Sequence, residues 1–223
     1  MPDSRKVAII TGASQGIGAG LVAGFRHAGY AVVGTSRSIR PSDESGYFTI
    51  QGDISEAETA ERVAEQALDR FGRIDSLIND AGIFISKPFT DYSPHDYAAI
   101  TAVNLAGFFH ITQRAIRQMV DQGSGHIVNI TTSIVDRPSS ERPSALVALT
   151  KGGLAAVTRS LAIEYAARGV RVNAVAAGVI KTPLHELDSY KGLAELHPLG
   201  RLGSGGTTEQ DIAIVEAAMR EAA

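Results

Sequence analysis

The strongest constraint on the fold of this chain is the alternation of short β-branched runs with longer segments of helical periodicity. We expect six strands, at 7–11, 31–36, 47–52, 74–79, 126–132 and 170–175. The segments between them repeat apolar residues every three or four positions, which is typical of amphipathic helices. Strands that alternate with helices pair in parallel, because each helix crosses over one face of the sheet. The sequence therefore predicts an α/β fold, a Rossmann-type, doubly wound parallel sheet in three layers.

The same periodicity predicts where the helices lie. We expect them at 17–27, 56–71, 94–122 and 144–167, with a last helix at about 209–219. Gly72 is a natural stop for the second helix. Residues 184–206 lack a clear period and are expected to form a loop or short helices. With no linker or repeat, the 223 residues predict one domain, 1–223.

Composition and charge exclude several classes of protein. The chain is 44% hydrophobic and 20% charged, and its net charge of -3 lacks the basic excess of a nucleic-acid binder. It has no cysteine, which rules out disulfides and thiolate chemistry, and no His or acidic spacing resembles a metal site. We see no signal peptide and no apolar stretch long enough to span a bilayer, so we expect a cytoplasmic protein without membrane contact.

A glycine-rich segment, Thr11–Gly18, follows the first strand and opens the first helix. Gly12 permits the tight turn, Gly16 allows the backbone to approach a pyrophosphate, and Gly18 allows the helix to pack on the sheet. The helix N-terminus adds free N–H groups and a partial positive charge. A plain strand-to-helix turn is the alternative, but the context of strand and helix favours nucleotide binding.

The end of the second strand bears on the choice of cofactor. NAD-binding proteins commonly place an acid there for the ribose hydroxyls, whereas this chain has Ser36, Arg37 and Ser38, with Arg40 just beyond. A guanidinium suits a 2′-phosphate. The sequence therefore favours NADP(H) over NAD(H), with a solvated loop arginine as the alternative.

Several motifs occur here in the order found in the short-chain dehydrogenase/reductase family, which the chain resembles from about Lys6 to Thr182. They are Thr-Gly-x-x-x-Gly-x-Gly at 11–18, Gly52-Asp53-Ile54, Asn79-Asp80-Ala81-Gly82, Val103-Asn104-Leu105, Lys151-Gly152-Gly153 and Ile180-Lys181-Thr182. The resemblance implies the fold and a nicotinamide cofactor. It also implies the cofactor-binding residues: Gly12, Ser14, Gln15, Gly16, Ile17, Gly18, Ser36, Arg37, Asp53, Ile54, Asn79, Ala81, Gly82, Lys151, Gly178, Ile180 and Thr182.

The resemblance further implies a catalytic set. In the family a serine binds the substrate oxygen, a tyrosine exchanges the proton, a lysine lowers the tyrosine pKa, and a helical asparagine holds a relay water. Here Thr132 stands at the serine position, Lys151 at the lysine and Asn104 at the asparagine. A threonine hydroxyl donates the same hydrogen bond as a serine.

The tyrosine position does not fit the family pattern. Val147 stands four residues before Lys151, and no tyrosine occurs between Tyr97 and Tyr165. An isopropyl group exchanges no proton. Ser144 lies on the same helical face, but we expect it to be the N-cap of its helix. The resemblance implies that residues 184–206 form a lid over the substrate. Replacement donors from this lid are Tyr190, His185 or His197, although we favour a plain surface role for the two histidines.

The C-terminal part departs from the family as well. Ala176-Ala177 precedes Gly178 where the family has a proline, and Ala223 is reached before any seventh strand. We expect the sixth strand to lie at a sheet edge. We also expect a homodimer through the two long helices, 94–122 and 144–167, as in the family.

Two functions agree with these observations. The first is an NADP(H)-dependent oxidoreductase that moves a hydride to or from a small-molecule carbonyl or alcohol, with an altered proton-transfer site. The second is a catalytically inactive NADP(H)-binding sensor or interaction protein with the same fold. We favour the enzyme, because one essential group is missing and the others remain. The substrate is set by variable loops and does not follow from the sequence.

Overall fold

The computed structural model of the chain describes residues 5–182, 192 and 202–204. Its main sheet has seven strands in the order β3-β4-β2-β1-β5-β6-β7, parallel except for β3. The strands are β1 (Val7–Thr11), β2 (Ala31–Ser36), β3 (Asp43–Glu44), β4 (Tyr47–Gln51), β5 (Ser76–Asn79), β6 (Gly125–Thr132) and β7 (Val170–Ala177). The predicted fold class is confirmed.

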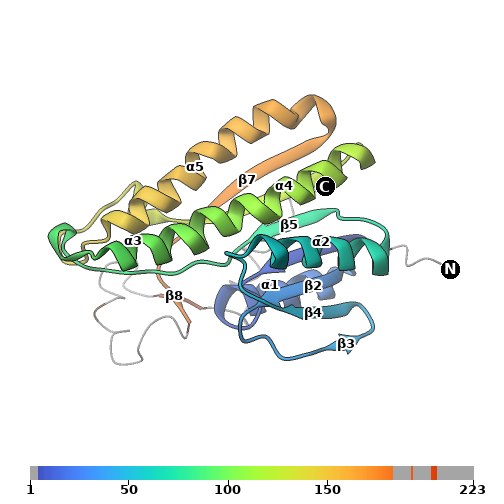
Figure 1. Cartoon of the computed structure of the whole chain (residues 1–223), viewed down its shortest axis with the longest axis horizontal. Helices are drawn as coiled ribbons and strands as arrows, with labels where there is room; N and C mark the ends of the chain where they lie inside the picture. The colour runs from blue at the N-terminus through green and yellow to red at the C-terminus, as the bar shows by residue number, and fades with distance from the viewer. Residues whose placement is uncertain (1–4, 183–191, 193–201, 205–223) are drawn as a thin grey trace.

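Helices cover both faces of the sheet (Figure 1). They are α1 (Gly16–His27), α2 (Ala57–Phe71), α3 (Pro94–Thr101), α4 (Phe108–Gln122) and α5 (Ala145–Tyr165). Short 3-10 helices lie at Phe89–Asp91, Ser133–Val135 and Ala166–Arg168. The core residues show that α1 packs on one face, whereas α2, α4 and the C-terminal half of α5 pack on the other.

The central strand β1 is apolar over its first four residues because both faces of the sheet are covered there. In β1, Val7 and Ile9 pack beneath α2 and α4, while Ala8 and Ile10 pack beneath α1. All four are fully buried. This two-sided burial is what a parallel sheet requires, and it holds the carboxyl ends of the strands in one plane.

The sheet contains one strand more than the six expected from the sequence. β3 has two residues, Asp43 and Glu44, and pairs antiparallel with β4. Both side chains are acidic and poor strand formers, so no local pattern marks them. Ion pairs of Arg70 with Asp43 and of Arg26 with Glu44 hold the strand in place. These contacts come from distant helices, which explains why the strand was missed.

The long helix expected at 94–122 is interrupted. α3 and α4 are joined by a π-helical segment, Ala102–Gly107, that contains Asn104. A π-turn inserts one extra residue per turn and is frequent at functional sites. The prediction of a single regular helix was therefore wrong at this point.

The C-terminal region is described only in part. β8 (Ile180–Lys181) pairs in parallel with β9 (Gly203–Ser204), so residues at the end of the predicted 184–206 loop return to the site. The rest of this lid segment, the candidates Tyr190, His185 and His197, and the helix expected at 209–219 lie outside the described residues. Within the described part, β7 is the edge strand, as expected.

One described helix, Ala145–Arg168, meets the length and composition of a membrane span. The expectation that no apolar stretch of this chain is long enough to span a bilayer was therefore wrong. In the structure, however, this helix packs along β6 and β7, and Leu161 and Ala162 contact the core. A long helix that covers a sheet and a helix that spans a membrane both carry apolar residues, because both bury apolar side chains away from water.

Candidate active site

One pocket, of about 330 Å³, lies at the carboxyl ends of the parallel strands. β1 pairs with β2 on one side and β5 on the other, so the strand order reverses at this point, where open α/β sheets bind ligands. The predicted residues that line it are Gly12, Ser14, Gln15, Gly16, Ile17, Ser36, Arg37, Asp53, Ile54, Ala81, Gly82, Thr132, Lys151, Gly178, Ile180 and Thr182. Three predicted site residues do not line the pocket, namely Gly18, Asn79 and Asn104.

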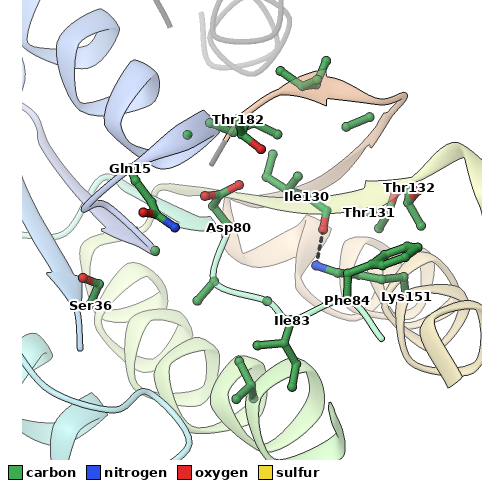
Figure 2. Close-up of a pocket in the computed structure, with 18 of the residues that line it drawn as sticks. Gln15, Ser36, Asp80, Ile83, Phe84, Ile130, Thr131, Thr132, Lys151 and Thr182 are labelled. Carbon is green, nitrogen blue, oxygen red and sulfur yellow. Dashed lines mark hydrogen bonds between the residues drawn. The ribbon is translucent and has the colours of Figure 1, made fainter. Parts of the chain in front are cut away.

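Figure 2 shows how the pocket is laid out. Ser36 and Gln15 lie toward one end, Lys151 and Thr132 toward the other, and Asp80 between them (Figure 2). Gln15 and Lys151, at opposite ends of the pocket, are 136 positions apart in the sequence. The parallel sheet brings these residues together because each lies at the carboxyl end of a strand or near the start of a helix.

The glycine turn has room for no side chain. Gly12 and Gly16 have φ angles of 73° and 57°, which L-residues with a Cβ rarely adopt. A Cβ on Gly18 would lie 2.3 Å from the Gly12 carbonyl oxygen. Gly18 is thus a packing residue beneath the turn and not a lining residue.

This turn fits the pyrophosphate of a nicotinamide dinucleotide. The first turn of α1 contains no acidic residue, and its N-cap, Gln15, makes no side-chain cap hydrogen bond. The glycines leave the backbone open to the pocket. N–H groups at a helix N-terminus without a side-chain cap are suited to a phosphate. The residues present therefore fit the cofactor that the sequence predicted.

The other end of the cofactor region holds Arg37 and Asp53. Their side chains lie 4.0 Å apart at the ends of β2 and β4, and Arg37 is 69% exposed. Asp53 accepts hydrogen bonds from the backbone N–H and hydroxyl of Ser55. Arg37 thus keeps a solvent-exposed guanidinium at the pocket edge, while Asp53 is fixed by the start of the following helix.

Asn79 holds the framework behind the pocket. Its Nδ2 donates to Thr112 Oγ1 at 2.9 Å and to Asn129 Oδ1 at 2.9 Å. It therefore ties β5 to α4 and β6 inside the protein. Asn79 is buried and does not line the pocket, and its role in cofactor binding stays a prediction.

Asn104 lies in the π-helical segment and hydrogen-bonds the backbone of Ile83. Its Oδ1 accepts from Ile83 N at 2.9 Å, and its Nδ2 donates to Ile83 O and to Thr150 Oγ1, each at 3.2 Å. A Cβ on Gly82 would lie 3.1 Å from Lys151 Nζ and 3.3 Å from Asn104 Oδ1. The absence of a side chain at Gly82 therefore leaves room for both Lys151 and Asn104.

Lys151 reaches the pocket from α5. Its Nζ donates to the carbonyl oxygen of Ile130, at the end of β6, at 2.7 Å (Figure 2). Burial lowers the pKa of this lysine, and the nearby carboxyl of Asp80 opposes the shift. The ammonium is thus held at a fixed place by a backbone acceptor.

Thr132 and Val147 form the substrate end of the pocket together with Phe84 and Ile134. Thr132 Oγ1 accepts from Ile134 N at 3.4 Å, which leaves the hydroxyl hydrogen available to a ligand. Val147 is 2% exposed and belongs to an apolar cluster with Ile100 and Leu146. The side chain at this position is hydrocarbon, as the sequence indicated.

Ser144 was expected to cap its helix, and this expectation is only half right. Ser144 occupies the N-cap position of α5, but its side chain makes no cap hydrogen bond. The hydroxyl donates instead to the Arg142 carbonyl oxygen at 2.9 Å. A ψ of 45° places the residue outside the extended geometry that a capping serine uses.

Two charged residues of the pocket were missed. Arg142 lies over the Phe84 ring, with its guanidinium carbon 5.1 Å from the ring centre. Asp80 follows β5 and lies between the glycine turn and Lys151. The signal for Asp80 was present in the sequence, because the resembling motif carries a second asparagine at that position.

Comparison with known proteins agrees with this geometry. Residues 6–190 match the family described as short chain dehydrogenase, which is more than half of the chain. This chain belongs to the short chain dehydrogenase family. A curated relative, the 3-oxoacyl-[acyl-carrier-protein] reductase of Synechocystis sp., is 32% identical over 212 residues, covering 90% of this chain and 84% of the relative.

Solved structures show the same similarity. The 3-ketoacyl-(acyl-carrier-protein) reductase of Brucella melitensis, in complex with NADH, has a TM-score of 0.84 and 29% identity, covering 98% of this chain and 90% of that one. ElxO with NADP bound has a TM-score of 0.87 and 28% identity, covering 98% and 92%. This short chain dehydrogenase is thus an oxidoreductase that acts on CH–OH and C=O groups with a nicotinamide cofactor.

Proposed function

We propose that this short chain dehydrogenase transfers a hydride between NADP(H) and a small carbonyl or alcohol substrate. One observation carries the proposal: a single pocket joins the glycine turn and Arg37 to Lys151 and Thr132. The cofactor would supply the hydride acceptor or donor when bound. Residues of the chain would bind the cofactor, orient the substrate oxygen and exchange the proton.

The cofactor half would be held by backbone and by charge. The glycine turn at Gly12–Gly18 binds the pyrophosphate, Asp53 holds the adenine end, and Lys151 bonds a ribose hydroxyl. Arg37 is the basis for choosing NADP(H), because its exposed guanidinium suits a 2′-phosphate. The structural relatives named above bind NADH in one case and NADP in the other, so they support a nicotinamide cofactor of either kind.

The substrate half would orient an oxygen and exclude water. Thr132 donates its hydroxyl to the substrate oxygen, and Lys151 with Asn104 holds the ribose and a water for proton exchange. Val147, Phe84 and Ile134 form an apolar wall that removes water from the reacting atoms.

The proton-transfer site of this chain differs from the pattern of the family. We propose that Val147 stands at the position of the family tyrosine, so another group, not yet identified, exchanges the proton. The alternative of an inactive cofactor-binding protein has no support in the comparisons. The curated relative named above is a reductase by name, and the pocket retains Lys151 and a hydroxyl at Thr132.

Titration and turnover together test the proposal. NADPH and NADH are titrated by fluorescence, and turnover is then measured on a panel of ketones, quinones and alcohols. We expect saturable binding with preference for NADPH, and turnover of at least one ketone or alcohol class. Absence of saturable binding of both cofactors would overturn the proposal, whereas binding without any turnover would favour the sensor interpretation.

We further propose a homodimer through the helices 94–122 and 144–167. Phe109 on α4 and Leu149 and Ile163 on α5 are 54%, 59% and 83% exposed, and the two helices pack on the same face of the sheet. An apolar face of this kind favours association. Sedimentation of the purified protein, which measures its mass in solution, tests whether it forms this homodimer. The cytoplasmic location and the absence of nucleic-acid and membrane partners stay predictions.

A further inference from the structure

A carboxyl group lies directly beneath the cofactor turn. Asp80 Oδ2 would be 3.1 Å from a Cβ on Gly12 and 2.9 Å from a Cβ on Gly18, so it touches both glycines from below. The carboxylate accepts a hydrogen bond from the backbone N–H of Gly18, in the first turn of α1. The backbone N–H groups of Asp80 and Ala81 both donate to Thr11 Oγ1, which fixes the chain at this point.

Two anions would therefore share one helix N-terminus when the cofactor binds. The pyrophosphate is attracted by the partial positive charge of α1, and the Asp80 carboxylate already uses that charge through Gly18. Like charges close together in an enclosed site raise the free energy of both unless one takes up a proton. The asparagine of the family motif avoids this conflict, because an amide is neutral.

The surroundings of Asp80 favour a proton even before any ligand arrives. Burial raises the pKa of the carboxyl to about 7, against the opposite effects of the Lys151 ammonium and the Gly18 N–H. The neutral and ionised forms are therefore both accessible near neutral pH. A nearby pyrophosphate would favour the neutral form further.

Other charged groups are few on the elements around Asp80. Among the described residues, the charged side chains that share its pocket are Lys151 from α5, Arg142 from the loop before α5, and the pair of Arg37 and Asp53 at the far end. From β1, Thr11 contributes a hydroxyl, and α1 contributes only glycine backbone. Lys151 is thus the side chain whose charge acts on Asp80.

We propose that Asp80 is a proton-binding residue coupled to the cofactor: it takes up a proton when the pyrophosphate occupies the glycine turn. Cofactor affinity then falls as the pH rises, because the concentration of protons available for uptake falls. This inference rests on the proposed function in one respect only, which is that the pocket binds a nicotinamide dinucleotide.

Binding of NADH between pH 6 and pH 9 tests the coupling. NADH is used because it lacks the 2′-phosphate, whose own ionisation falls in this range at about pH 6. We expect the Kd of the parent to be roughly tenfold or more higher at pH 9 than at pH 6, since one ionisation changes an equilibrium by about tenfold per pH unit above its pKa. Calorimetry in two buffers of different ionisation enthalpy should show uptake of about half a proton at pH 7.

Asp80→Asn is the deciding variant, and Asp121→Asn is its control. The asparagine oxygen still accepts from Gly18 N–H, so the fold is retained, whereas Asp121 is an exposed residue of α4. We expect Asp80→Asn to bind NADH with nearly the same Kd at pH 6 and pH 9 and without proton uptake. Asp121→Asn should behave as the parent.

The outcomes separate the two proposals. A parent Kd that does not change with pH would overturn the coupling and leave the proposed function intact. A pH dependence that persists in Asp80→Asn would assign the proton to another group, Lys151 first, and overturn the role of Asp80. Failure of the parent and of Asp80→Asn to bind NADH or NADPH at any pH would overturn the proposed function and this inference with it.

Discussion

Val147 and Lys151 lie one turn apart on α5 and both line the same pocket, one with an isopropyl group and the other with an ammonium. The pair places hydrocarbon one turn before a lysine that is fixed by the Ile130 carbonyl. Under the proposed function, Val147 stands where the family carries its proton donor, so the site would keep the lysine that tunes this donor and would lack the donor itself.

Val147→Tyr should restore the family arrangement. A phenol one turn before Lys151 would have its pKa lowered by the ammonium, and general acid–base catalysis contributes about a hundredfold or more. We therefore expect kcat on a ketone substrate to rise by roughly that factor. Val147→Phe is the control, because it adds the same ring without the hydroxyl.

Both variants add bulk to a residue that is 2% exposed, so both should lower the melting temperature by a similar amount. Equal turnover in the parent and in Val147→Tyr would contradict the prediction and show that the parent already has a donor of its own.

Arg37→Ala should change the choice of cofactor. Loss of a charge-assisted contact with a 2′-phosphate raises the Kd of NADPH by about tenfold, while NADH, which lacks that phosphate, is unaffected. Fluorescence titration of both cofactors measures the ratio. Arg40→Ala is the matched control, since Arg40 is exposed and lies outside the pocket. A parallel loss of NADH binding in Arg37→Ala would mean that the guanidinium does not select the phosphate.

Thr132→Val should impair turnover without impairing cofactor binding. The substitution keeps the shape and removes the hydroxyl that would orient the substrate oxygen, so we expect kcat/KM to fall by roughly tenfold. Ser133→Ala removes the neighbouring hydroxyl and should have little effect. If the two variants lose the same activity, Thr132 is not the orienting group.

Gly18→Ala and Gly153→Ala should act in opposite directions on stability. A Cβ on Gly18 would meet the Gly12 backbone, so we expect a loss on the order of 2 kcal/mol and loss of cofactor binding. A Cβ on Gly153, in α5, would meet only Leu105 Cδ2 at 4.0 Å. Alanine there should raise the unfolding free energy by about 0.5 kcal/mol, because it favours the helix. Denaturant unfolding measures both, and a stable Gly18→Ala that binds cofactor would contradict the packing role of Gly18.

Local patterns predicted most of the fold and the glycine turn that lines the pocket. The apolar runs of β1, β2 and β6 identified buried parallel strands, and the spacing of Gly12, Gly16 and Gly18 identified the turn. These features depend on neighbours within a few residues, namely backbone sterics and the period of burial, and so they are visible in the sequence alone.

Long-range contacts decided the rest. β3 depends on ion pairs with α1 and α2, and the pairing of Gly203–Ser204 with Ile180–Lys181 joins segments more than twenty residues apart. The motif of Asn79 predicts a role in cofactor binding, which stays a prediction, whereas the hydrogen bonds of its side chain to α4 and β6 follow from the tertiary structure. Its motif was informative about the family, but its partners lie 33 and 50 residues away.

The linear order of residues determined by itself that this chain folds as a doubly wound sheet with a glycine turn and lacks a tyrosine near Lys151, because residue identity and short periods suffice for these. Only the tertiary structure decided that Asp80, which is half-buried, lies beneath that turn and near Lys151, since the electrostatic surroundings of a carboxyl depend on which distant groups surround it and on how much water they exclude.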